Sequence, residues 1–138
     1  MIQSRIAEAV SAWAEKALAL PFTIYCDIIP DADRDGACIR HDPTPAAERR
    51  FSDGSRLVSW NFTFYMRCRD AADAREYAKR TVDALDGITV ERGGLTIDCE
   101  AVTLPQFIDT DGKGFTTYSA AIRASCSEEN EGEQFPFE

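Results

Sequence analysis

The stretch of sequence that decides the fold runs from Val58 to Cys68 and reads VSWNFTFYMRC. Its apolar side chains occupy every second position: Val58, Trp60, Phe62, Phe64, Met66 and Cys68. The positions between them, and the one just beyond, carry Ser59, Asn61, Thr63, Tyr65, Arg67 and Arg69. Successive side chains of a strand point to opposite faces, so this period of two predicts a long, half-buried antiparallel strand.

Two amphipathic helices are predicted to cover the apolar face of this strand. Residues 2–19 place apolar side chains at helical spacing, and Pro21 ends the pattern. Residues 71–85 form an alanine-rich run, with Asp70 placed to cap its start and Gly87 its end. The inward stripes of the two helices are Ile2, Ile6, Ala9, Val10, Trp13 and Ala17, then Ala74, Tyr77, Ala78, Val82 and Leu85.

Shorter alternating runs predict the remaining strands, at residues 22–29, 37–41, 95–104 and 115–126. The segment from Asp42 to Gly54 contains two prolines and is expected to be a long exposed loop. The order of elements is α-β-β-β-α-β-β. It predicts an α+β fold, a mostly antiparallel sheet of four to five strands with two helices packed on one face. We expect residues 1–126 to form one domain.

The charge is distributed unevenly along the chain. The sequence holds 24 acidic and 15 basic residues, a net charge of −9. Five glutamates and no basic residue fall in residues 127–138, which leaves 19 acidic and 15 basic residues, a net charge of −4, on residues 1–126. We therefore expect a flexible acidic tail. Because an acidic surface repels phosphate groups, we expect no specific nucleic-acid binding and no membrane association.

The five cysteines, Cys26, Cys38, Cys68, Cys99 and Cys126, include no C-x-x-C pair. The odd number and the missing pair argue against a disulfide framework or a zinc site. All five fall in predicted strands, where cysteine behaves as a small buried apolar residue. We expect reduced core thiols in a protein made in the cytoplasm.

One segment imitates a calcium-binding loop. Asp31, Asp33 and Asp35, with Gly36 and with Asp42 at the twelfth position, have the spacing of an EF-hand loop. That motif needs a helix on each side, whereas here a predicted strand precedes it and Pro43 follows. We expect a solvated turn and no metal site. Residues 109–114 are likewise predicted to be a hairpin turn.

No catalytic motif stands out. His41 is the only histidine. A catalytic histidine needs a nucleophile and an orienting carboxylate in space around it, and the sequence shows neither arrangement, so we expect a histidine on the surface or at the edge of a loop. The chain has no Gly-rich phosphate loop after a strand, no G-x-S-x-G and no H-E-x-x-H. We therefore predict no catalytic residue, no cofactor and no enzymatic activity.

Five residues are candidate partner contacts, because arginine and aromatic side chains are enriched at binding hot spots. Arg49, Arg50 and Phe51 lie on the long predicted loop. Tyr65 and Arg67 lie on the outer face of the central strand, next to Arg69.

The order of these features carries a resemblance. An N-terminal helix leads into Pro21-Phe22-Thr-Ile-Tyr25, the aromatic strand contains Trp60-Asn-Phe62-Thr-Phe64-Tyr, and an Arg69-Asp70 turn starts the helix of residues 71–85. In this order the chain resembles the tail terminator, or minor capsid, proteins of long-tailed bacteriophages and prophages. The resemblance covers about residues 1–126 and leaves Asp42–Gly54 and the acidic tail unmatched.

The resemblance implies a structural protein with no catalytic residues. Such proteins form a six-fold ring that caps the growing tail tube, stops its polymerisation and offers a docking surface to the head connector. The implied partners are further copies of the chain, the major tail tube protein and the head completion protein. The implied location is the virion tail, assembled in the bacterial cytoplasm. Head-to-tail contacts require two different surfaces on one domain, and sheet edges and the Asp42–Gly54 loop are candidates.

Two other classes of function stay open from the sequence alone. A small α+β ligand-binding or enzymatic domain would need a polar or ionisable group on the apolar face of the central strand. That face shows none, because it consists of Val58, Trp60, Phe62, Phe64 and Met66. An acidic inhibitor or immunity-type module would bind a basic partner with a strong dependence on salt.

Overall fold

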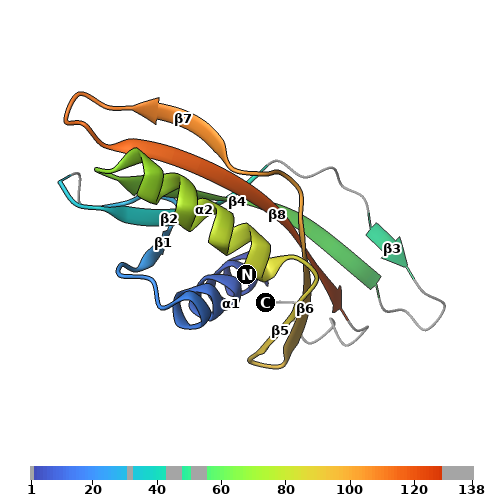
Figure 1. Cartoon of the computed structure of the whole chain (residues 1–138). Helices are drawn as coiled ribbons and strands as arrows, with labels where there is room; N and C mark the ends of the chain where they lie inside the picture. Colours follow the sequence, from blue (N-terminus) through green and yellow to red (C-terminus); the bar gives the residue numbers. More distant parts are fainter. Residues whose placement is uncertain (1, 31–32, 43–47, 51–55, 129–138) are drawn as a thin grey trace.

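The computed structural model describes residues 2–30, 33–42, 48–50 and 56–128. Both helices lie on one side of a curled sheet (Figure 1). Within the described residues the sheet has eight strands in the order β1-β2-β4-β8-β6-β5, with β3 paired to β4 and β7 paired to β8. The elements are α1 (Ile2–Leu18), β1 (Ile24–Cys26), β2 (Gly36–His41), β3 (Glu48–Arg50), β4 (Arg56–Cys68), α2 (Ala71–Leu85), β5 (Thr89–Arg92), β6 (Leu95–Ala101), β7 (Gln106–Thr110) and β8 (Thr116–Glu128).

The long strand predicted from the aromatic stretch is confirmed as β4. It pairs antiparallel with β8 along the whole length of both strands, from Arg56 opposite Glu128 to Cys68 opposite Thr116. The side chains of Trp60, Phe62, Phe64, Met66 and Cys68 are all buried, whereas the alternate positions from Ser59 to Arg67 are half-buried. The side chain of Val58 lies outside the part of the chain that the structure describes. β4 and β8 together form the spine of the sheet.

Small residues of β8 face large residues of β4 across this spine. Ala120 lies opposite Phe64, and Ala124 lies opposite Trp60. The predicted core face of β8 is confirmed at Ala120, Ile122, Ala124 and Cys126, which are buried, while Tyr118 is half-buried. The alanines leave room for α2, which packs mainly on β8 and β4.

Both helices are confirmed to within one residue of their predicted ends. Ile6, Ala9, Val10 and Ala14 of α1 are buried, and this helix contacts β1, β2, β5 and α2. α2 begins after Asp70, whose carboxylate accepts a hydrogen bond of 2.9 Å from the backbone N–H of Ala72.

The predicted sheet is only partly right, because the strands are more numerous and the sheet is mixed. β1 and β2 pair in parallel, with Tyr25 opposite Cys38. Asp27 follows β1 with φ +76°, a left-handed conformation that changes the direction of the chain. The strand predicted over residues 22–29 is therefore shortened to three residues, and only Ile24 of its expected apolar face is buried, since Phe22 is half-buried and Cys26 and Ile28 are exposed.

Three short strands were not predicted. β3 lies inside the segment from Asp42 to Gly54 that was expected to be a loop. β5 forms a hairpin with β6 through Gly93 and Gly94, which both have positive φ. β7 follows the segment predicted as strand 95–104, of which β6 covers only Leu95–Ala101. The predicted order of long elements is correct, and the short edge strands are additions to it.

Candidate interaction surfaces

The outer face of β4 carries two of the predicted partner contacts. Tyr65 and Arg67 are both half-buried there. The guanidinium carbon of Arg40, on β2, lies 5.0 Å from the centre of the Tyr65 ring, a cation–π distance. Arg67 donates a hydrogen bond of 2.7 Å to the backbone carbonyl of Arg34. Neighbouring parts of the same chain therefore already hold these side chains in place.

Phe115 is a buried aromatic residue on this outer face, and the alternation of β8 did not reveal it. Its side chain is only 2% exposed. The guanidinium carbons of Arg67 and Arg69 lie 5.3 and 4.5 Å from its ring centre. The sequence offers only an indirect signal for this burial: an isolated phenylalanine at the start of one predicted strand, and two arginines at the end of another. The two arginines thus cover an apolar ring, and their planar faces are not fully available to a partner.

Turn residues near Phe115 connect the β1–β2 connection, the end of β4 and the β7–β8 turn through an ion pair and hydrogen bonds. Lys113, in the turn between β7 and β8, forms an ion pair of 2.8 Å with Asp33, in the connection between β1 and β2. Asp35 accepts a hydrogen bond of 2.9 Å from the backbone N–H of Arg69. Asp111 accepts hydrogen bonds from the backbone N–H groups of Lys113 and Phe115 at 2.9 and 3.0 Å.

The carboxylates of the calcium-loop pattern therefore have partners within the protein. Asp33 and Asp35 hold the turn contacts just described, and Asp42 accepts a hydrogen bond from the hydroxyl of Thr63. Asp31 lies outside the described residues. Across the part of the chain that the structure covers, no group of three or more His, Cys, Asp or Glu side chains is arranged to hold a metal ion.

The turn at Asp111 predicts a contribution to stability that depends on pH. Hydrogen bonds from the backbone, chiefly from the N–H of Phe115 and then of Lys113, lower the pKa of Asp111 below its usual value. Since the pKa in the folded state is the lower one, the ionised group stabilises the fold above about pH 4 and loses this effect as the pH falls through the folded pKa. We expect Asp111→Asn, which keeps the acceptor oxygen, to make the acid-side fall in melting temperature shallower.

The measurement is the melting temperature of both proteins between about pH 7 and pH 2.5. Glu91→Gln is a matched control, because it neutralises an exposed carboxylate on β5. If the melting temperature falls equally steeply at low pH in the wild type and in Asp111→Asn, the ionised Asp111 does not stabilise the fold as proposed.

The thiols are distributed differently from the prediction of five core cysteines. Cys38, Cys68, Cys99 and Cys126 are buried, but Cys26 is exposed, because β1 ends there at the edge of the sheet. Burial raises the pKa of Cys68 and of Cys99 to about 12. A thiol nucleophile needs a lowered pKa, so these groups do not behave as catalytic thiols.

The backbone of two other predicted contacts, Arg49 and Arg50, lies far from Tyr65 and Arg67. The backbone of Arg49 and Arg50 belongs to β3, where Arg49 pairs with Leu57; their side chains, and all of Phe51, lie outside the described residues. Leu57 and Tyr65 are eight residues apart on β4, roughly 27 Å at the rise of an antiparallel strand. The backbone of Arg49 and Arg50 is therefore well separated from Tyr65 and Arg67. His41 is exposed at the end of β2, with its ring centre 5.5 Å from that of Phe62.

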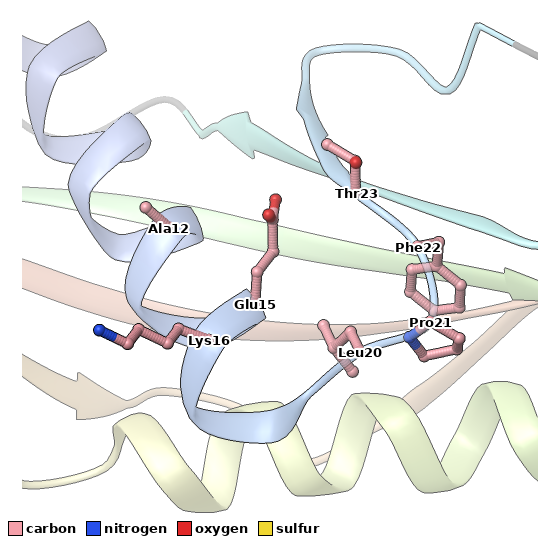
Figure 2. A pocket seen from close by; sticks show the side chains of 7 residues that line it. All are labelled: Ala12, Glu15, Lys16, Leu20, Pro21, Phe22 and Thr23. Carbon is pink, nitrogen blue, oxygen red and sulfur yellow. The ribbon is translucent and has the colours of Figure 1, made fainter.

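Two shallow hollows flank the connection between α1 and β1. The larger, about 460 Å³, is lined by Ala12, Glu15 and Lys16 of α1 and by Leu20–Thr23 (Figure 2). The carboxylate of Glu15 accepts a hydrogen bond of 2.7 Å from the backbone N–H of Ile24, so it is used within the fold. The second, about 300 Å³, shares Pro21–Thr23 and extends to Tyr25, Ile29 and Arg34–Gly36. Both lie at the edge of the sheet, away from the buried face of β4.

Fold and surfaces together define the class of protein. The described residues form a small α+β fold around an apolar core, and its surface features are sheet edges, turns and an arginine-rich outer face. Neither of the two described helices is long and apolar enough to cross a membrane.

The comparisons with known proteins agree with a structural role. A family model described as "Bacteriophage tail terminator protein" matches residues 7–127, nearly the whole described fold. The chain belongs to this family.

Solved structures show the same fold at low sequence identity. One, which carries only a sequence identifier, shares 19% identity over 91% of this chain and 92% of its own, with a TM-score of 0.53. Another is a chain of a particle described as "Virion of native gene transfer agent (GTA) particle", with 16% identity over 84% of this chain and 85% of its own and a TM-score of 0.51. No curated protein matches the chain. The family and this fold identify a virion-associated structural protein of a family without enzymatic members.

Proposed function

We propose that this protein is the tail terminator of a long-tailed phage or prophage: six copies close into a ring on the finished tail tube, stop its growth and join it to the head. The observation that carries this proposal is the match of the tail terminator family model to residues 7–127. The partners are further copies of this chain, the major tail tube protein and the head completion protein. Assembly takes place in the bacterial cytoplasm, and the product is part of the virion tail.

The shape of the domain supports an architectural task. Ring closure by identical subunits needs two different surfaces on each copy, and this sheet offers edges of different character at β1 and at β5 and β7. The negative charge of the chain suits the wall of a channel through which DNA passes, because like charges keep adhesion low.

The ligand-binding alternative finds little support in the core. It requires a polar hollow behind the central strand, where Trp60, Phe62, Phe64 and Met66 are instead buried against apolar neighbours. The hollows described above lie beside the connection between α1 and β1, and neither is lined by a residue of β4. The acidic inhibitor alternative rests on composition alone.

An in-frame deletion of the gene in the phage or prophage that encodes it tests the proposal. We expect DNA-filled heads without tails, together with unattached tails of variable and excessive length, and loss of infectious particles. Supplying the full chain in trans is expected to restore tails of one length. Electron microscopy measures the distribution of tail lengths and the fraction of heads that carry a tail.

A deletion strain that makes joined virions with tails of uniform length would refute the proposal. A strain with free heads but tails of normal length would restrict the function to head–tail joining. Density for a six-fold ring at the head-proximal end of wild-type tails, absent from the deletion strain, supplies an independent readout of the ring.

A further inference from the structure

Exposed large apolar side chains gather at two opposite edges of the sheet. Within the described residues they form two groups, which we name the β1-edge patch (Tyr25 and Ile28) and the β7-edge patch (Val102, Leu104, Phe107 and Ile108). β2, β4 and β8 lie between β1 and β7, so the two patches are roughly 19 Å apart at the usual spacing of strands. Figure 1 shows β1 and β7 on opposite sides of β4 and β8.

The β7-edge patch lies along one edge of the sheet: Phe107 and Ile108 belong to the edge strand β7, and Val102 and Leu104 lie in the segment just before it. All five residues of β7 are exposed, and the register shifts at Ile108, where a bulge lies between Phe107 and Asp109. Leu104 is 73% exposed and Phe107 is 58% exposed. The ring centre of Phe107 lies 5.9 Å from that of Tyr118, which fixes the phenylalanine on its strand. A cluster of exposed apolar side chains along a sheet edge is typical of a protein–protein contact.

The β1-edge patch has a different character, because its backbone is partly blocked. The N–H of Ile24 points away from β2 and donates to the Glu15 carboxylate at 2.7 Å. β1 is therefore a poor template for an added strand. It offers side chains instead: Tyr25 is 43% exposed and Ile28 is 62% exposed.

Charged groups next to the two patches are complementary. Arg40, which is exposed, donates through Nε to the backbone carbonyl of Asp27 at 2.7 Å, and this places its guanidinium group beside the β1-edge patch. Asp109 is exposed beside the β7-edge patch. An Arg40–Asp109 pair would set the register of a contact between the patches. Since the guanidinium group of Arg40 already donates to the backbone carbonyl of Asp27 and lies over the Tyr65 ring, we assign the pair to the orientation of the contact and not to its affinity.

We propose that the β7-edge patch of one copy of this chain packs on the β1-edge patch of the next copy, head to tail. This inference deepens the proposed function and rests on it, because it names the contact between subunits of the ring. Two different patches on opposite edges are what a heterologous contact requires, since each copy then uses one patch on each side and the contacts continue until they close. The six side chains form the apolar centre of the interface, and the charged groups form its rim.

Cross-linking between two single-cysteine variants tests the contact directly. Ile28→Cys and Leu104→Cys are made in full-length protein that also carries Cys26→Ser, which removes the exposed native thiol. The two variants, one of them tagged so that dimers differ in mass, are mixed in equal amounts and treated with a short bis-maleimide. Random collisions would give mixed dimers as half of all dimers. We expect mixed dimers to dominate, and each variant alone to cross-link poorly.

Further variants separate this contact from others. For this test the cysteine of the second copy is moved from position 104 to position 107, as Phe107→Cys, and this copy is mixed with the Ile28→Cys variant. Adding Leu104→Asp to the Phe107→Cys copy is expected to abolish the excess of mixed dimers. Ala72→Asp is the matched control, because it adds the same charge at an exposed position of α2, a helix that contributes no residue to either patch, and is expected to leave the excess unchanged. Mixed dimers at the random share, or a preference for dimers of one variant with itself, would overturn the proposal.

The phage supplies a second readout. We expect Leu104→Asp to fail, and Ala72→Asp to succeed, in restoring uniform tails to the deletion strain. If the deletion strain shows the terminator phenotype but mixed dimers stay at the random share, the subunit contact proposed here is wrong and the terminator function stands. If mixed dimers dominate and the deletion strain makes normal virions, the contact stands and the terminator function is wrong.

Discussion

Replacing Phe64 by alanine is expected to lower the free energy of unfolding by about 3–5 kcal/mol. Phe64 is fully buried in β4, opposite Ile39 on β2 and Ala120 on β8. The strands on both sides are held by their own hydrogen bonds, so the cavity left by the ring cannot collapse easily. This loss is a large part of the 5–15 kcal/mol that stabilises a typical domain.

Chemical denaturation of the two proteins, monitored through the tryptophans, measures the difference. Phe107→Ala is the matched control, because the same side chain is removed from a position that is 58% exposed on β7. In dilute protein we expect this variant to lose about 1 kcal/mol or less, mostly from the contact with Tyr118. Equal losses at the two positions would show that the apolar face of β4 does not form the main core.

The long elements could be predicted because each one carries a complete periodic signal. Residues 58–68 alternate without a fault, and the alanine-rich run after Asp70 is α2 with both predicted ends. In a long strand many residues place their apolar side chains on the same face. Shifting the strand by one residue would move all of them to the solvent, so burial of that face stabilises the predicted register. The α+β class and the placement of both helices on one face of the sheet follow from these signals.

The parallel pairing of β1 with β2 could not be predicted in this way. Two short strands joined by a turn-rich segment normally form an antiparallel hairpin, because parallel neighbours usually need a connection of a dozen or more residues. Here the chain reverses through Asp27, which has positive φ, and β1 keeps only three residues. Such a short strand has no periodicity of its own, and its direction depends on packing against α1.

The candidate surfaces show the same division. Tyr65 and Arg67 could be placed on the outer face because they belong to the alternation of β4, whereas their role as partner contacts stays a prediction. Phe115 was missed, since its ring is covered by Arg67 and Arg69, which lie at the end of β4 and just beyond it, far from Phe115 in the sequence. β7 was missed because its bulge at Ile108 breaks the alternation, and no residue of this strand is buried. Features that depend on one contact between distant segments leave no repeated trace in the sequence.

Thiol labelling is expected to separate one cysteine from the other four. Cys26 is exposed at the end of β1, whereas Cys38, Cys68, Cys99 and Cys126 are at most 3% exposed. With an excess of a chromogenic disulfide reagent, we expect one thiol per chain to react in the folded protein and five to react in denaturant. Since a buried thiol reacts only after the structure opens, an opening free energy of about 4 kcal/mol slows its reaction by about a thousandfold.

The dependence of this reaction on pH and the Cys26→Ser variant complete the test. Partial burial, and then the charges of Asp27 and Glu8, raise the pKa of Cys26 above its ordinary value of 9.0. The fast phase is therefore expected to accelerate as the pH rises towards and beyond 9, because the thiolate is the reacting form. Cys26→Ser is expected to remove this phase while leaving stability nearly unchanged. A fast phase that survives the substitution, or one that comprises several thiols, would contradict the burial of the other four cysteines. A wild type without a fast phase would mean that Cys26 is buried, as the alternation of residues 22–29 first indicated.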